Sequence, residues 1–588
     1  MAGTRGQHRA PPAGRGAKAV VRRRAAALTA RARLAWTAPA VAIALTAVAV
    51  RLLFLGERQL FRDEAASWLE SSYPLPRLLE VAAGQPYPPL HALLLHAWTS
   101  FAGDAELALR LPAAIAGLAL VAIGWRWAHE ALGPWPGLVA AIVLALSPLA
   151  VANAREARMY ALESALSAAA WWLTWRLLSG RVAARGPLAV HGLFLALAVA
   201  GELWTMALGL ALACLQGVVA LGALLADRRR SGAAAALLAI CLGGLAFLPW
   251  LPALFAVATN GQAYWTPTPG VLDWTVSLGT ALLGWREELP LFLSLRVLLL
   301  AIVASGAVAL VFERDRARRT LGWCLLAGLA VPLALWAISQ FRSIYDTRYL
   351  GPVVAPLALA IAAGFQLAFA ILRARAAGRR VPAGRRRLPP GRRFAGEEVA
   401  VGAAALLAIG LLLAGPMGIA LGLWLDEWRS ERGLAPTQGF VVALRPRLGP
   451  GDVVISLDAR SYFPLAYAAH RLAEAGEPLP APVFDWDSGR EPFYRGQSLI
   501  PPGRVLDAAD VEEAGGWGRL PGLGRGSSIW LAILARGRDE PLGFAPLAEG
   551  ELEEVARIVV APVGQAAEAR QLVPTGGEGS EAVRMGGG

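Results

Sequence analysis

Residues 206–226 read MALGLALACLQGVVALGALLA, a run of 21 positions without a charged side chain. A helix rises about 1.5 Å per residue, so about 20 apolar residues cross a hydrocarbon core of roughly 30 Å. The run therefore predicts a transmembrane helix. Similar blocks recur over the first 420 or so residues, and hydrophobic residues make up 56% of the 588-residue chain. Soluble domains contain about 45–50%, so the composition argues against a water-soluble protein.

The apolar blocks predict a polytopic α-helical membrane protein with about eleven transmembrane helices. Their expected positions are 36–55, 109–129, 135–153, 161–179, 187–205, 206–226, 233–257, 291–312, 320–340, 350–372 and 398–422. One more apolar helix, 89–101, is shorter than the roughly 17 residues that a span requires. We expect this helix to be juxtamembrane or re-entrant.

The net charge of +13 comes from two short segments. Residues 1–35 carry nine basic side chains and residues 373–393 carry nine arginines, with no acid in either, so the rest of the chain sums to about −5. Basic segments beside spans are typical of cytoplasmic loops. The basicity therefore requires no nucleic-acid partner.

The positions of the arginines also predict the orientation of the chain. With the N-terminus in the cytoplasm, the arginine-rich loops at 228–230, 314–319 and 373–393 all face inward, as the positive-inside rule requires. The loops 56–108, 154–160, 258–290 and 341–349 then face outward, together with a short turn near 201–206 that contains Glu202 and everything after residue 422. The expected location is the inner or plasma membrane.

A soluble pattern begins where the hydropathy falls, after about residue 425. Strands are expected at 452–456, 528–534 and 558–563, and a helix at 462–475 with Pro464 in its first turn. The predicted organisation is a basic cytoplasmic segment (1–35), a multi-span catalytic domain (36–424), an extracytoplasmic α/β domain (425–574) and a disordered tail (575–588).

The first external loop contains an acidic pair, Asp63 and Glu64, about ten residues after the first span. A carboxylate that accepts a proton from an attacking hydroxyl must be reached by water and lie near a lipid-borne substrate. Asp63 meets both conditions by its position. Solvated charges or a helix start are the simpler interpretation of the same pair.

Two further external loops carry arginines next to spans. Arg155 and Arg158 lie in the second loop, and Tyr345 and Arg348 lie in the segment 342–349. The planar guanidinium group binds phosphate oxygens in a bidentate manner, although arginines at a membrane interface often serve only as anchors. The span count places all three loops on one side, where they are able to converge on one site.

These loops, taken in order, resemble a known family. The motifs are Arg62-Asp63-Glu64, Tyr87-Pro88-Pro89-Leu90-His91, Leu109-Arg110-Leu111-Pro112, Arg155-Glu156-Ala157-Arg158-Met159-Tyr160-Ala161-Leu162 and Arg348-Tyr349-Leu350-Gly351-Pro352. The ordered series over about 300 residues resembles that of bacterial membrane mannosyltransferases, protein O-mannosyltransferases and lipid A aminoarabinose transferases, all of the GT-C fold.

The resemblance implies an inverting transfer of a sugar from a polyprenyl-monophosphate donor to an acceptor hydroxyl on the outer face. It implies that Asp63 is the base and Glu64 its neighbour in the site. The resemblance also implies that Arg155 and Arg158 hold either the second-loop geometry or the donor phosphate. It places Tyr345 and Arg348 near the donor phosphate too. Tyr87 departs from the pattern, because relatives often have Lys or His before the Pro-Pro pair.

Four more side chains are expected to line a substrate groove: Tyr87, His91, Tyr160 and Glu202. A nucleotide-binding signature is absent, and the lipid-linked sugar is the expected donor. A divalent metal is not indicated, since His91 and His96 do not share a helical face well. The expected acceptor is a protein, a lipid or a polysaccharide. The resemblance favours mannose as the sugar, with arabinose derivatives, galactose and glucose as alternatives.

Two other functions fit a polytopic protein. A transporter or flippase of lipid-linked precursors should carry charged residues within its spans, often in repeated halves. Only Glu163, near the start of the fourth span, suggests this. The third interpretation is a nonenzymatic component whose external tail binds a partner, and the three polar loops argue against it.

Overall fold

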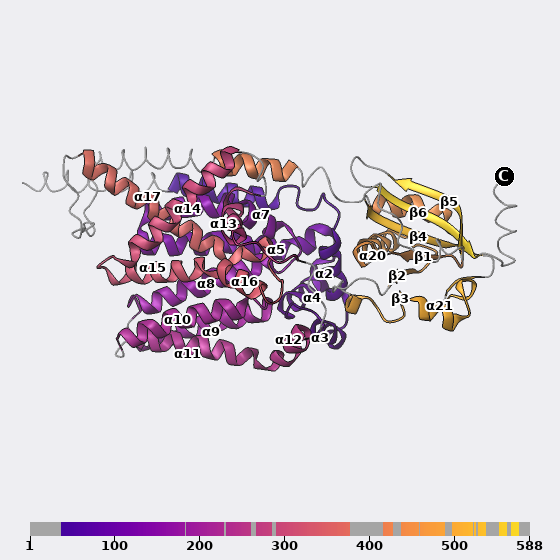
Figure 1. Ribbon diagram of the computed structural model, residues 1–588, viewed down its shortest axis with the longest axis horizontal. Coiled ribbons are helices and arrows are strands. Elements are labelled where there is room, and N and C mark those ends of the chain that lie inside the picture. The colour runs from indigo at the N-terminus through magenta and orange to yellow at the C-terminus, as the bar shows by residue number, and fades with distance from the viewer. Residues whose placement is uncertain are drawn as a thin grey trace, which may run out of the picture.

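The computed structural model describes residues 37–182, 184–227, 231–259, 266–284, 290–376, 415–426, 437–457, 459–487, 497–520, 522–524, 527–536, 552–560 and 566–574. Within these residues the chain forms a bundle of long helices, with a smaller unit of strands and helices at one end of it (Figure 1). The predicted basic segment 1–35 and the tail 575–588 lie outside the described residues.

Among the residues that the structure describes, seven helical segments are long and apolar enough to cross a membrane. They are α5 (Glu106–Leu132), α9 (Arg185–Thr205), α10 (Gly209–Ala226), α11–α12 (Ser231–Phe247 and Leu251–Thr259, joined by η1, Leu248–Trp250), α14 (Pro290–Val311), α15–α16 (Arg316–Leu329 and Val331–Ser339), and η2–α17 (Thr347–Val353 and Val354–Ala376). All seven coincide with predicted spans.

The other four predicted spans differ from this pattern. The span 135–153 consists of two helices, α6 (Pro134–Leu146) and α7 (Pro148–Arg155), which are bent by 52° relative to each other. If the two are counted as one span, they make an eighth crossing. The chain bends at Ser147, whose side chain caps α7, and at Pro148 in the first turn of α7. The first helix, Thr37–Leu52, is shorter than the seven. Most of 398–422 lies outside the described residues.

The fourth of these spans, 161–179, forms α8 (Tyr160–Leu178). Helix α8 is not among the seven candidate spans, because Glu163, Arg176 and several tryptophans lower its mean hydropathy. Trp171 and Trp175 are fully buried in the helix packing, so α8 is a central helix that is shielded from lipid along much of its length.

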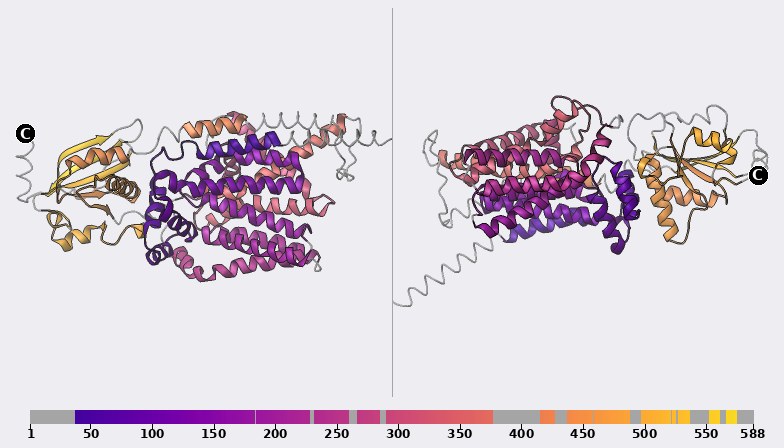
Figure 2. Two further views of the ribbon diagram at one scale, coloured as in Figure 1. Left: turned by 180° about the vertical axis from the view of Figure 1, so that it is seen from behind. Right: turned by 90° about the horizontal axis from the view of Figure 1, so that it is seen from below.

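Three short helices follow the first helix: α2 (Arg62–Ser72), α3 (Leu75–Ala83) and α4 (Leu90–Ala102). The apolar helix predicted at 89–101 is therefore confirmed as a helix of 13 residues, too short to span. It ends at Gly103, where the backbone turns with φ of 75°. Figure 2 shows these helices between the bundle and the strands.

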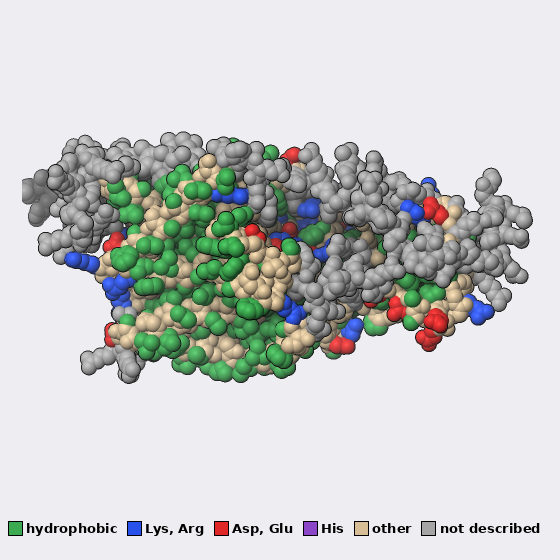
Figure 3. Space-filling view, in the orientation of Figure 1, with side chains coloured by type: hydrophobic (Ala, Val, Ile, Leu, Met, Phe, Trp, Pro, Cys, Tyr) green, Lys and Arg blue, Asp and Glu red, His purple; other side chains and the backbone are tan. Residues whose placement is uncertain are grey.

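The flank of the bundle is apolar. Figure 3 shows hydrophobic side chains over most of the visible face of the bundle, with charged side chains nearer its ends. Exposed members include Phe194, Leu221, Leu242 and Val297. Such a surface can face lipid, because its side chains are apolar and the helices satisfy their own backbone hydrogen bonds.

Helices α14 and α17 approach each other closely at two glycines. A methyl group at Gly306 would overlap the carbonyl oxygen of Ala360 and the backbone of Gly364, and one at Gly364 would overlap the carbonyl oxygen of Ile302. Small residues let helix backbones pack closely in membranes, where interhelical packing replaces the hydrophobic effect.

We expect Gly306→Ala to lower stability by about 1–3 kcal/mol, because both backbones must separate to admit the methyl group. The midpoint of thermal unfolding in detergent measures this. Gly222→Ala is the control, since nothing lies within 4 Å of a methyl group there and alanine favours a helix. Equal midpoints for the two variants would contradict the close packing.

The C-terminal part forms a six-stranded sheet in the order β3-β2-β1-β4-β6-β5. The strands are β1 (Val453–Ser456), β2 (Val483–Trp486), β3 (Val505–Leu506), β4 (Ile529–Arg536), β5 (Leu552–Val560) and β6 (Ala566–Pro574). Neighbours among β1 to β4 are parallel, and β6 is antiparallel to both β4 and β5.

Both faces of this sheet are covered. Val454 of β1 packs with α19 (Thr437–Leu444) and α20 (Ala459–Glu474), while Val453 and Ile455 pack with α21 (Ala508–Ala514). Alternate residues of a strand point to opposite faces, which explains the fully buried run in β1. The predicted α/β fold of this region is confirmed.

Individual elements of this unit agree with the prediction to different degrees. The predicted elements at 452–456, 462–475 and 528–534 correspond to β1, α20 and β4. β5 begins six residues before the predicted 558, and β2, β3 and β6 were not predicted. Pro464 lies in the second turn of α20, not the first, because the helix begins at Ala459.

Helix α2 is the principal contact between the two parts. Trp68 of α2 shares a hydrophobic cluster with Phe463 and Tyr467 of α20. The hydroxyl of Tyr73 donates to the carbonyl oxygen of Leu499 at 2.6 Å. The helix that begins at Arg62 is thus held on both sides, by the bundle and by the α/β unit.

Candidate active site

Asp63 and Glu64 lie in the first turn of α2, where the positive end of the helix dipole favours carboxylates. Successive helical residues point about 100° apart, so the two side chains have different surroundings. The Asp63 side chain is 15% exposed and the Glu64 side chain is 1% exposed. Only Asp63 is therefore open to water.

Asp63 forms an ion pair with Arg348, 285 residues further along the chain. Its Oδ2 lies 3.1 Å from Nη1 of Arg348, and its Oδ1 accepts from Nε of Arg62 at 2.9 Å. Asp346 orients Arg348 by accepting from its Nη2 at 3.2 Å. The loop after the first helix and the loop 341–349 therefore meet at Asp63.

Opposing effects act on the pKa of the Asp63 carboxyl. Burial alone would raise it, but the charges of Arg62, Arg158 and Arg348 outweigh burial and hold the pKa of Asp63 well below its usual range. The carboxyl is consequently ionised throughout the physiological range in the unliganded protein.

Arg158 of the second loop completes the cluster. Its Nη1 donates to the hydroxyl of Ser67 at 3.0 Å and to the carbonyl oxygen of Asp63 at 3.3 Å. The guanidinium group lies over the rings of Tyr87 and Tyr160, 5.3 and 5.7 Å from their centroids. Five of the predicted residues thus come together: Asp63, Tyr87, Arg158, Tyr160 and Arg348.

Tyr87 occupies the position at which relatives often carry a basic residue. Its hydroxyl forms a 2.8 Å hydrogen bond with the hydroxyl of Tyr349, and the ring of Tyr349 also packs against Tyr160 at 5.9 Å. In this chain the position contributes an aromatic wall and a hydroxyl, while the positive charge comes from Arg158.

Glu64 contacts Arg110 of α5 inside the protein. Its two oxygens accept from Nε and Nη2 of Arg110, both at 2.7 Å, and Oε1 also accepts from the backbone N–H of Ala157 at 2.9 Å. The other donors of Arg110 bind the carbonyl oxygens of Leu55, Arg58 and Gln59. Glu64 thus ties the first loop both to α5, through Arg110, and to the second loop, through Ala157.

Arg155 and Tyr345, both predicted to lie near the donor phosphate, contact backbone carbonyl oxygens outside the Asp63 cluster. Arg155 is 1% exposed, and its Nη1 donates to the carbonyl oxygens of Val50 and Leu53, both at 2.9 Å. The hydroxyl of Tyr345 donates to the carbonyl oxygen of Asp273 at 3.4 Å, and burial raises the pKa of Tyr345 to about 12. These contacts position backbone segments behind the cluster.

The expected position of Glu202 in an external loop is wrong. Glu202 lies inside α9, fully buried, where its carboxylate accepts from Nε2 of Gln216 in α10 at 3.2 Å. Ser167 and Glu163 of α8, both fully buried, are also close to this carboxylate. The turn expected near 201–206 is instead the last turn of α9, which ends at Thr205, and helix packing encloses the Glu202 side chain.

Some titratable groups beside the cluster were not predicted as site residues. Burial raises the pKa of Glu156 to about 7, and it does the same for Glu70, on which Arg158 acts in the opposite direction. Ser67 and Glu70 lie four and seven residues after Asp63, and such spacing places them on one helical face. That spacing was visible in the sequence once the helix was assumed.

His91, a predicted groove residue, lies on α4 near Arg158. Burial, and next the charge of Arg158, lower the pKa of His91 to about 3, so the imidazole is neutral at physiological pH. A neutral ring beside Arg158 is suited to hydrogen bonding with a substrate hydroxyl.

Comparison with known proteins agrees with this architecture. Residues 86–253 match the family described as dolichyl-phosphate-mannose-protein mannosyltransferase. The structure of ArnT from Cupriavidus metallidurans in the apo state superposes with a TM-score of 0.55 at 16% identity, covering 91% of this chain and 98% of that one. No curated protein matches the sequence.

Two further solved structures are similar. ArnT from the same organism bound to undecaprenyl phosphate has a TM-score of 0.55 at 15% identity, covering 90% of this chain and 97% of that one. The apo oligosaccharyltransferase of Archaeoglobus fulgidus has a TM-score of 0.48 at 13% identity, covering 76% and 64%.

The chain is therefore a multi-pass membrane protein with the GT-C fold of membrane glycosyltransferases. The predicted resemblance to mannosyltransferases and to aminoarabinose transferases is confirmed, in sequence over residues 86–253 and in fold over most of the chain.

Proposed function

We propose that this protein transfers a sugar from a polyprenyl-monophosphate donor to an acceptor hydroxyl on the extracytoplasmic face of the membrane, with inversion at the anomeric carbon. One observation carries the proposal: Asp63 lies 3.1 Å from Arg348 and beside Arg158 at the end of a GT-C bundle. A candidate base and two phosphate-binding cations thus occupy one cluster.

The low pKa of Asp63 makes it a weak base before the donor arrives. A donor phosphate that binds Arg348 and Arg158 withdraws part of their positive charge from Asp63. The pKa of the carboxyl then rises toward that of a useful general base. Donor binding therefore activates the base, and Asp63 stays unprotonated while the site is empty.

The chemical step has one nucleophile and one leaving group. The acceptor oxygen attacks the anomeric carbon, its proton passes to Asp63, and the bond between the anomeric carbon and the phosphate oxygen breaks. The electron pair of that bond stays on the lipid phosphate, whose negative charge Arg158 and Arg348 stabilise. Preorganised cations in a water-poor site are effective at this. Glu64 keeps the loop in place through Arg110.

The sugar, the acceptor and the orientation are part of the proposal. Mannose is favoured by the family match over residues 86–253, and undecaprenyl phosphate, bound by the similar ArnT structure, is the first lipid to test. The α/β unit lies beside the candidate site, which suits a role in acceptor recognition. The arginine-rich loops predict that this end is extracytoplasmic.

Transfer from radiolabelled polyprenyl-phosphate sugars in membranes that contain the protein tests the proposal. We expect at least one donor to yield a labelled acceptor fraction, and Arg348→Gln to reduce the rate about 10²–10³-fold, as loss of one preorganised charge contact does elsewhere. Arg77→Gln is a matched control in the same loop, since the described contacts of Arg77 are an ion pair with Glu80 and the ring of Tyr73, and neither residue belongs to the Asp63 cluster. Absence of transfer from every donor would contradict the proposal.

One observation favours the transporter as a second candidate. Glu163 and Glu202 are buried together within α8 and α9, and carboxyls inside a membrane are often part of an ion or substrate path. Translocation of a fluorescent lipid-linked sugar in proteoliposomes, abolished by Glu163→Gln and unaffected by Arg348→Gln, would support that function instead.

A further inference from the structure

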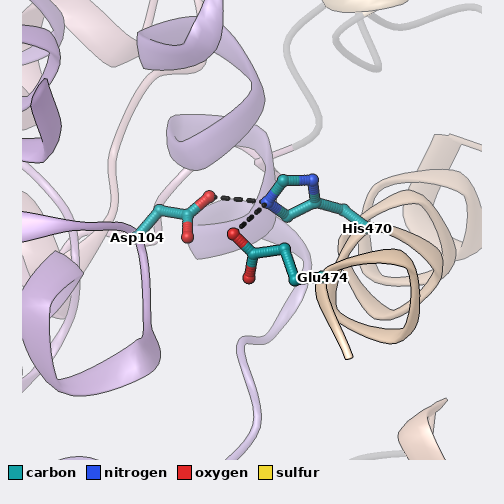
Figure 4. A group of neighbouring side chains, drawn as sticks. All are labelled: Asp104, His470 and Glu474. Carbon is teal, nitrogen blue, oxygen red and sulfur yellow. Dashed lines mark hydrogen bonds and ion pairs between the residues drawn. The ribbon is translucent and has the colours of Figure 1, made fainter. Parts of the chain in front are cut away.

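Three side chains of metal-ligand type converge where the α/β unit meets the bundle. Asp104 belongs to the turn between α4 and α5, and His470 and Glu474 belong to α20 (Figure 4). Nε2 of His470 lies 2.8 Å from Oδ2 of Asp104 and 3.6 Å from Oε1 of Glu474. One ligand atom from each residue lies within 4.8 Å of the others.

These spacings are close to those of a tetrahedral zinc site. Zinc binds nitrogen and oxygen at about 2.0–2.2 Å, so neighbouring ligand atoms in a tetrahedron are roughly 3.3–3.5 Å apart. The observed 2.8 and 3.6 Å lie on either side of that value. His470 and Glu474 are four residues apart on one helical face, so small side-chain rotations suffice to bring both to an ion.

The surrounding groups hold the two carboxylates in a useful orientation. Nη1 of Arg471 pairs with the outer oxygens, Oδ1 of Asp104 at 3.7 Å and Oε2 of Glu474. Nε1 of Trp68 donates to Oδ2 of Asp104 at 2.8 Å, and the ring of Trp68 packs against that of His470 at 4.9 Å. Oriented carboxylates and a packed imidazole are typical of the groups around bound metals.

We propose that Asp104, His470 and Glu474 bind a divalent transition metal of the zinc type, with water in the fourth position. The set of one imidazole and two carboxylates suits zinc better than magnesium or calcium, which prefer oxygen alone. Glu474 is exposed, so an ion can enter from solvent. The metal would join the α/β unit to the turn after α4, next to the helix that carries Asp63.

Zinc binding by the full-length protein in detergent tests this proposal, using protein without a polyhistidine tag. After removal of metal with a chelator and dialysis, we expect one bound zinc per chain by elemental analysis and a rise in unfolding midpoint with zinc that equimolar magnesium does not produce. His470→Gln and Asp104→Asn should both lose the bound zinc and the rise.

Two variants separate a metal site from a plain ion-pair network. Arg471→Gln removes the ion pairs but keeps all three ligands, so zinc binding should persist or become tighter because a competing cation is gone. His191→Gln, on α9 and bonded only locally to Pro187 in the described structure, should leave zinc binding unchanged. The proposal is overturned if His470→Gln binds as much zinc as the wild type, or if Arg471→Gln abolishes binding while remaining folded.

Discussion

Asp63→Asn is expected to lower the rate of sugar transfer by about 10²–10⁴-fold, the usual contribution of a general base. Asparagine keeps the size of the side chain and still accepts a hydrogen bond from Arg348, but it cannot take the proton of the acceptor hydroxyl. The substitution should lower kcat, because the proton is taken up in the chemical step. Initial rates with saturating labelled donor measure it.

Donor binding separates a catalytic role for Asp63 from a structural one. Removal of the carboxylate charge frees Arg348 and Arg158 for the donor phosphate, so polyprenyl phosphate should bind Asp63→Asn as tightly as the wild type or more tightly. Glu80→Gln, on the exposed surface of α3, is the matched control and should retain full activity. Wild-type activity in Asp63→Asn would show that Asp63 is not the general base.

Arg110→Met is expected to destabilise the protein by about 3–5 kcal/mol, the usual cost when one partner of a buried ion pair is removed. The change leaves the Glu64 carboxylate buried without its cation, and it leaves the carbonyl oxygens of Leu55, Arg58 and Gln59 without this donor. Thermal or chemical unfolding in detergent measures the loss.

Helix α5 provides an internal comparison for this variant. Arg126, on the same helix, pairs with Glu130 four residues away and is 59% exposed, so Arg126→Met should cost no more than about 0.5 kcal/mol. The double variant with Glu64→Gln and Arg110→Met should be more stable than the sum of the single changes predicts, because no charge remains unpaired. A simple sum of the two effects would argue against the buried pair.

Much of the fold was predictable because long apolar blocks have few alternatives to membrane helices. Seven such blocks became continuous spans. Ser147 and Pro148, where the chain bends, lie inside the single predicted span 135–153, because an apolar block does not show where a helix changes direction. Short strands such as β3, with two residues, leave too little pattern for prediction.

The candidate site was predictable in part for a different reason. Residues beside spans are confined to one of two faces, so the order of the motifs was enough to group Asp63, Arg158 and Arg348. Which side chain of a motif faces the Asp63 cluster depends on helix rotation, and single-sequence patterns do not encode this. Glu64 therefore proved to be paired inside the protein, and Glu202 to be enclosed by α8 and α10.

The two ion pairs of the first loop differ in the length of chain that must be synthesised before each can form. Glu64 and Arg110 are 46 residues apart, so they can meet once the first helices have left the ribosome and entered the membrane. Asp63 and Arg348 are separated by 285 residues. The nascent chain thus acquires its scaffold early and its candidate active site late. Under the proposed function, a product that stops before η2 would be inserted in the membrane but unable to transfer a sugar.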